Sequence, residues 1–115
     1  MLFTTFTIGE KEYKARLTTK AVIELERKLG TNPVNVLLGM ASNENQLPNL
    51  ETLLMFLHAS LKTSIPGLTI DETYGIYDEM IEEGKDISDL INLIVSILQE
   101  SGLAPSEAKN PKKGK

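Results

Sequence analysis

The chain has 115 residues, 41% of them hydrophobic and 24% charged, which is the composition of one ordinary globular domain. It has no cysteine, which excludes disulfides and thiol chemistry, and one histidine, which excludes a multi-histidine metal site. Residues 1–103 hold 15 acidic and 8 basic side chains, a balance of −7, and residues 104–115 hold four lysines and one glutamate. An acidic body argues against a nucleic-acid partner, because such binding depends on basic contacts to phosphate.

The first residues, MLFTTFTIGE, have no basic region ahead of an apolar run, so we expect no signal peptide. The longest apolar stretches are far shorter than the ~20 residues that a membrane-spanning helix needs. We therefore expect a soluble, intracellular protein with no membrane partner.

Residues 2–17 predict a β-hairpin. Residues 2–8 are mostly β-branched or aromatic, and a turn is expected at 9–11. After the turn, the apolar residues Tyr13, Ala15 and Leu17 alternate with polar ones. An isolated two-stranded hairpin is marginally stable in water, so it should lie on the helices or extend another sheet.

Five helices are predicted after the hairpin. The first begins at Thr18 or Thr19 and ends at Gly30, with Ala21, Val22, Leu25 and Leu29 on its buried stripe. A short second helix opens at Asn32-Pro33. The third runs from about Leu50 to Ser64.

The third predicted helix is apolar around almost its whole circumference. Its only continuous polar rail consists of Glu51, His58 and Lys62. A helix of this kind in water must be wrapped by other helices or by a partner.

The fourth predicted helix starts with the capping-box spacing of Thr69 and Glu72 and ends near Gly84. It carries Ile70, Tyr74, Tyr77 and Ile81 at spacings of four, three and four, which predicts an apolar stripe along one face. Asp86 should cap the fifth helix, which continues to about Glu100.

These elements predict a mainly α domain of the α+β class over residues 1–103, with the helices packed around the central apolar helix. Residues 104–115 have no periodic apolar pattern and should form a disordered basic tail.

No catalytic constellation is present, so we expect no enzyme and no cofactor or metal. There is no serine nucleophile elbow and no glycine-rich phosphate loop. His58 should be solvated or locally paired, since no partner for general-base chemistry can be identified. The residues PVNVLLG, at the place of a recognition helix, contain no arginine, lysine or glutamine to contact base edges.

The fourth helix presents an acidic face, in which Asp78 and Glu82 belong to one rail. Residues 71–89 contain eight acids and one base. The face is either a solvated surface or a docking surface for a basic partner or for the chain's own lysine tail. A divalent-cation site is the third reading, although the spacing matches no calcium loop.

The fifth helix is apolar over roughly 200°, where a surface helix needs only about 100°. The excess is either buried in the core or offered to a partner. We expect Leu93 and Ile97, at the edge of the stripe, to contact a partner helix or another copy of this chain.

Two segments, FTIGEKEYKARLTTKAVIELERKLGTNPVNVL at residues 6–37 and IPGLTIDETYGIYDEMIEEGKDISDLINLIVSILQESG at residues 65–102, carry a resemblance to a known family. Taken with the hairpin and helix pattern, the chain resembles the tail assembly chaperones of long-tailed bacteriophages and prophages of Gram-positive bacteria. The resemblance covers most of the chain and rests on general pattern rather than on a diagnostic motif.

The resemblance implies a non-enzymatic protein of the host cytoplasm. Such a protein keeps the tape measure protein soluble and brings subunits of the tail tube, the major tail protein, to it. The family often makes a longer product by a −1 ribosomal frameshift, and Pro111-Lys112-Lys113 is compatible with a slippery A-AAA-AAG run. The alternative is a structural virion protein, such as a head–tail joining or tail component.

Overall fold

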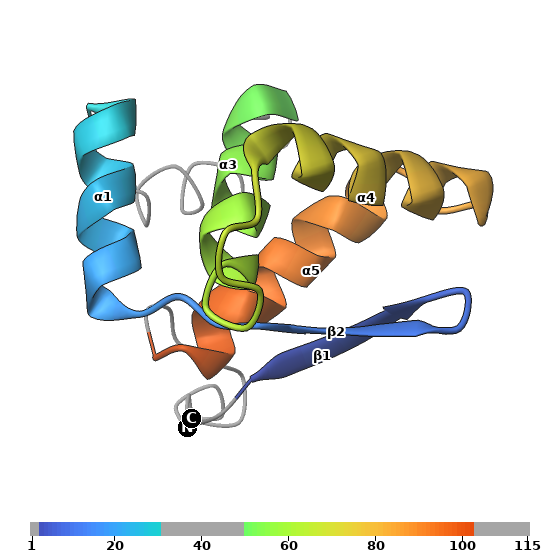
Figure 1. Ribbon diagram of the computed structural model, residues 1–115, viewed down its shortest axis with the longest axis horizontal. Helices are drawn as coiled ribbons and strands as arrows, with labels where there is room; N and C mark the ends of the chain where they lie inside the picture. The colour runs from blue at the N-terminus through green and yellow to red at the C-terminus, as the bar shows by residue number, and fades with distance from the viewer. Residues whose placement is uncertain (1–2, 31–49, 103–115) are drawn as a thin grey trace, which may run out of the picture.

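A computed structural model describes residues 3–30 and 50–102, in which a two-stranded antiparallel sheet is followed by four helices (Figure 1). With the labels of Figure 1, the elements are β1 (Thr4–Ile8), β2 (Lys11–Ala15), α1 (Thr19–Leu29), α3 (Leu50–Leu61), α4 (Ile70–Glu82) and α5 (Ile87–Glu100). The predicted α+β class, with its N-terminal hairpin, is confirmed. The helix expected from Asn32-Pro33 and the tail at 104–115 lie outside the described residues.

The hairpin has the alternation that the sequence predicts. Its strands pair from Thr4 with Ala15 to Ile8 with Lys11, so the turn consists of only two residues. Gly9 takes the left-handed φ of 61° at the first turn position, a conformation that favours glycine. On the face toward the helices, the rings of Phe6 and Tyr13 stack with centroids 5.2 Å apart.

The helix starts are fixed by the side chains that the sequence singles out. The Thr18 hydroxyl accepts from the Ala21 amide at 3.2 Å, which makes Thr18 the N-cap of α1. Thr69 and Glu72 form the predicted capping box of α4, and the same arrangement begins α5 at Asp86. Each cap satisfies amide groups that the first helical turn would otherwise leave unpaired.

Helix α3 contacts α1, α4, α5 and β2, and these elements surround it in Figure 1. It contributes a large part of the buried core, with Leu53, Leu54, Phe56, Leu57, Ser60 and Leu61 all buried. Coverage is incomplete, because Met55 and Ala59 remain half-buried and Leu50 is 41% exposed.

The buried side of α4 differs from the predicted stripe. The core face consists of Thr73, Ile76, Tyr77 and Met80. Of the predicted stripe, Tyr74 is 38% exposed and Ile81 is 48% exposed. The helix is turned by about 100°, one residue of rotation, from the expected position. Burying Thr73 is inexpensive, because its hydroxyl donates to the Thr69 carbonyl at 3.1 Å.

The chain just after β2 is fixed to the ends of two helices by hydrogen bonds. The Arg16 amide donates to the Ser60 carbonyl at 3.0 Å, and the Thr63 hydroxyl donates to the Arg16 carbonyl at 2.9 Å. The Leu17 amide donates to the Ser101 hydroxyl at 3.0 Å, which ties the start of α1 to the end of α5. These bonds hold a hairpin that would be marginal alone.

We predict that Ser101→Ala lowers the free energy of unfolding by about 1–3 kcal/mol, because it leaves the buried amide of Leu17 without its partner. Urea denaturation followed by circular dichroism measures this change. Ser96→Ala, at an exposed position of the same helix, is the matched control and should change stability much less. Equal effects of the two substitutions would contradict the role of the Ser101 hydroxyl.

Candidate protein-binding groove

A groove of about 510 Å³ lies between α1, α3 and the segment that leads from α3 into α4. One face of α3 and the first residue after it form the floor of this groove. The residues of the floor recur at helical spacings and are Glu51, Met55, His58, Ala59 and Lys62. The polar rail of Glu51, His58 and Lys62 therefore borders an apolar strip of Met55 and Ala59. The sequence indicated the rail but did not show that α1 and the start of α4 pack on either side of it.

The first wall of the groove is one face of α1. Ala21 and Leu25 supply apolar surface near the floor, and Lys20, Glu24 and Lys28 repeat every four residues along the rim. Thr18, the N-cap of α1, lines the end of this wall.

The second wall is the segment between α3 and α4 together with the first turns of α4. It presents Leu68, Ile70 and Tyr74 to the groove. The imidazole Nε2 of His58 lies 2.8 Å from the Leu68 carbonyl oxygen and donates to it, which holds this wall against α3. The prediction that His58 is solvated or locally paired is thus confirmed as local pairing.

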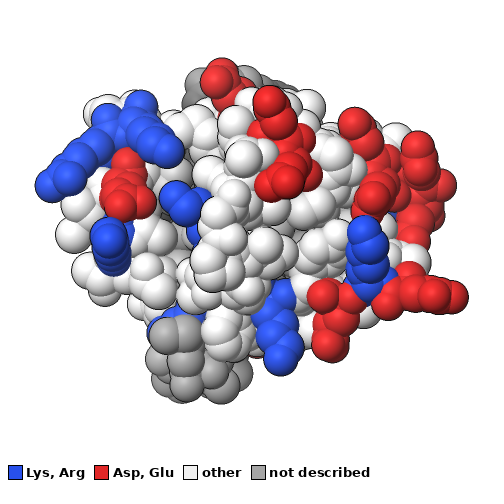
Figure 2. All heavy atoms as spheres, in the orientation of Figure 1, with Lys and Arg blue, Asp and Glu red and all other residues white. Residues whose placement is uncertain are grey.

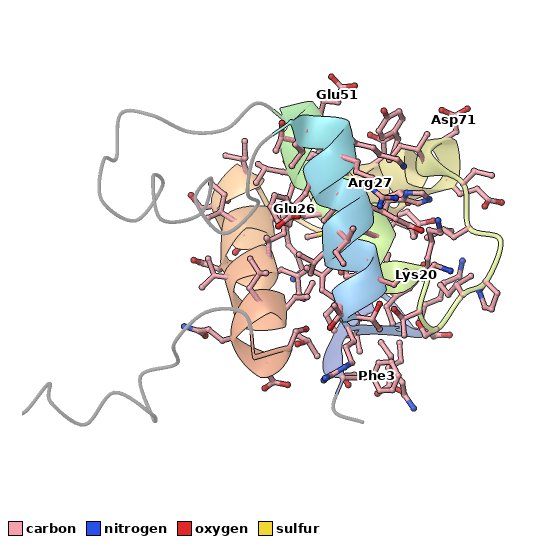
Figure 3. The ribbon with its side chains drawn as sticks, turned by 90° about the vertical axis from the view of Figure 1, so that its left-hand side faces the viewer. Phe3, Lys20, Glu26, Arg27, Glu51 and Asp71 are labelled. Carbon is pink, nitrogen blue, oxygen red and sulfur yellow. The ribbon has the colours of Figure 1, made fainter. Side chains whose placement is uncertain are left out.

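The two ends of the groove differ in charge. In Figure 3, Lys20 lies near the lower end of α1, at one end of the groove. Glu51, at the start of α3, lies at the opposite, upper end. Lys62 lies at the Lys20 end, because the bond between Thr63 and Arg16 brings the end of α3 beside the start of α1. Lys28, in the last turn of α1, lies toward Glu51, where the charges are mixed.

A second, shallower hollow of about 340 Å³ adjoins the groove and shares Glu51 and Tyr74 with it. Its apolar surface comes from Leu50, Leu54 and the two tyrosines of α4, and Asp78 lies on its border. The predicted site residue Asp78 is therefore at a hollow, while Glu82 is exposed one turn further along α4. Figure 2 shows acidic side chains gathered over α4 and several basic ones over α1.

The predicted contact residues of α5, Leu93 and Ile97, line neither hollow and are less exposed than expected. Ile97 is only 1% exposed and belongs to the core with Leu90, Ile94 and Leu98, and Leu93 is half-buried. The expectation that Ile97 stands open to a partner is therefore wrong for this fold. The wide stripe is largely used inside the domain, because α5 packs against both α3 and β1. A contact at Leu93 stays a prediction.

Within residues 3–30 and 50–102, no group of three or more His, Asp or Glu side chains is arranged to hold a metal ion. In the same part of the chain, no helix is long and apolar enough to cross a membrane. What the geometry can do is bind: an apolar strip with a charged rim is suited to a protein segment.

The comparison with known families agrees with a protein-binding role. A family model described as "Phage tail assembly chaperone protein, TAC" matches residues 5–111. This match spans nearly the whole chain, so the chain belongs to the phage tail assembly chaperone family. No curated protein and no solved structure matches it.

We predict that Ile97→Glu unfolds the domain or lowers its stability by several kcal/mol, since an unpaired carboxylate would be buried among aliphatic side chains. Asn92→Glu, on the exposed side of α5, is the control and should remain folded. Thermal melts of the two variants test this. A folded and stable Ile97→Glu protein would contradict the burial of Ile97 in the core.

Tyr77 generates a prediction about pH. Burial raises the pKa of its phenol above the ordinary value of 10.0, and the negative charges of Asp86 and Asp89 raise this pKa further. The unfolded chain therefore loses the Tyr77 proton first, and the stability that the neutral phenol contributes is lost as pH rises above about 10. Urea melts at about pH 8 and about pH 11 should show a larger loss for the wild type than for Tyr77→Phe. Equal losses would contradict this assignment.

Proposed function

We propose that this protein is a non-enzymatic chaperone that binds the tape measure protein during tail assembly and helps to recruit tail-tube subunits. The observation that carries the proposal is the family match over residues 5–111. The apolar groove between α1, α3 and α4 supports it, because a chaperone of this kind needs a surface that holds an exposed segment of another protein.

The finer assignment rests on the resemblance of residues 6–37 and 65–102. This resemblance supports an origin in long-tailed phages or prophages of Gram-positive bacteria and a role in the cytoplasm of the host. The tape measure protein is long and prone to aggregate, so a small acidic protein that covers its apolar segments would keep it soluble.

A frameshifted longer form is the second part of the proposal. A slippery A-AAA-AAG run at Lys112-Lys113 and an open −1 frame beyond it would support this form. An immediate stop codon in that frame would remove the longer product and leave the chaperone assignment in place.

The alternative function is that of a structural virion protein, such as a head–tail joining or tail component. The two functions differ in where the protein ends up. A structural component would be retained in purified particles, whereas an assembly chaperone would be absent from them.

The test is coexpression in bacteria with the tape measure protein from the same phage genome. We expect the fraction of tape measure protein that stays in the supernatant after centrifugation to rise severalfold when the chain is present. An unrelated acidic protein of similar size is the control. No difference from this control, or recovery of the chain in finished particles, would overturn the proposal.

A further inference from the structure

We infer that the groove binds one amphipathic helix of about three turns, lying parallel to α3, with acidic side chains in its last turn beside Lys20 and Lys62. The inference rests on the proposed function only for the identity of the protein that supplies this helix. The chemistry of the occupant follows from the groove itself.

One apolar face of α3 lacks full cover. A helix that is apolar on nearly all sides needs cover on all sides. Within residues 3–30 and 50–102, α1, α4, α5 and β2 leave two apolar parts of α3 without full cover: Leu50 at its start, and the strip of Met55 and Ala59, which stay half-buried on the groove floor. One more helix laid along this strip would cover it.

The groove has the size of a short helical segment. The floor runs from Glu51 to Lys62, which is about 16 Å of helix at 1.5 Å per residue. A volume of about 510 Å³ accommodates a few aliphatic side chains rather than a whole folded domain. These dimensions match a helical segment with apolar anchors at i, i+4 and i+7.

The charges at the two ends of the groove select the partner and the direction in which it lies. Lys20 and Lys62 are both exposed, and neither forms an ion pair with another part of the described chain. At the other end, Lys28 and Glu51 offer both signs. The C-terminal end of a helix carries a partial negative charge, so the favoured occupant places that end at Lys20 and Lys62. Asp or Glu in its last turn opposes the occupant's own dipole, but the charge-assisted contact to two lysines is the stronger effect.

The probe is a synthetic peptide of about 15 residues in an Ala/Gln background, with leucines at i, i+4 and i+7 and two glutamates in its last turn. A second peptide carries lysines in place of the glutamates. Fluorescence anisotropy with the full chain should show binding of the glutamate peptide about tenfold tighter than that of the lysine peptide. Equal affinities would overturn the charge assignment.

The variants separate the groove from the rest of the surface. Ala59→Arg fills the floor and should abolish binding, and Ala21→Arg on the facing wall provides a second test should the first variant fail to fold. Ile23→Arg is the matched control, since Ile23 is 41% exposed and lies outside the groove. In Lys62→Glu the difference between the two peptides should largely disappear, because this end of the groove then carries one charge of each sign. Unchanged binding by both folded groove variants would overturn the proposal.

The direction of the helix is tested separately by NMR. A nitroxide at the C-terminus of the glutamate peptide should broaden the amide signals of Lys20 and Thr63 more strongly than that of Lys28. The chain has no cysteine, so the label stays on the peptide. Stronger broadening at Lys28 than at Lys20 would overturn the parallel orientation.

Two further outcomes identify a different occupant. A change from dimer to monomer in Ala59→Arg, measured by light scattering, would show that a second copy fills the groove. A large fall in the melting temperature of both folded groove variants, with no peptide bound by the wild type, would show that the chain fills its own groove. Either result overturns the proposal.

Failure of this inference can be told from failure of the proposed function. If the wild type and Ala59→Arg keep the tape measure protein equally soluble, the groove is not the site but the chaperone function stands. If the wild type does not keep it soluble, the proposed function fails whatever the peptides do.

Discussion

The structure depends on one constraint: α3 carries apolar side chains around most of its circumference, and the rest of a small chain must keep them from water. Leu53, Leu57 and Leu61 disappear completely into the core, and burial of one such side chain stabilises a fold by about 1.5–3 kcal/mol. Helices α1, α4 and α5 and strand β2 take their places around this helix. The groove lies where that cover ends, so the same constraint that organises the core also leaves an apolar strip open.

Local chemistry explains why much of the architecture could be predicted. Thr18, Thr69 and Asp86 mark helix starts because their side chains accept from amides two or three residues ahead, a bond that needs no information from distant parts of the chain. The hairpin was predictable for a similar reason, since alternation and a glycine turn are local features.

Which face of a helix is buried, in contrast, depends on the elements that pack against it. Helix α4 holds two overlapping apolar stripes, and only packing decided that Ile76 and Met80 go inside while Tyr74 and Ile81 stay outside. The same holds for α5, whose wide stripe left the place of Ile97 open until α3 and β1 were positioned against it. The groove was beyond prediction for this reason: it exists only when α1 and the segment after α3 pack on either side of α3, and Glu51, His58 and Lys62 alone look like a solvated rail.

The bond between Leu17 and Ser101 has a consequence for engineered fusions. It brings Ser101, the residue after α5, next to the residue before the Thr18 cap, so Gly102 follows close to the start of α1. A segment inserted directly after Gly102 would therefore begin beside α1, and its first residues would change the surroundings of a helix that forms one wall of the groove.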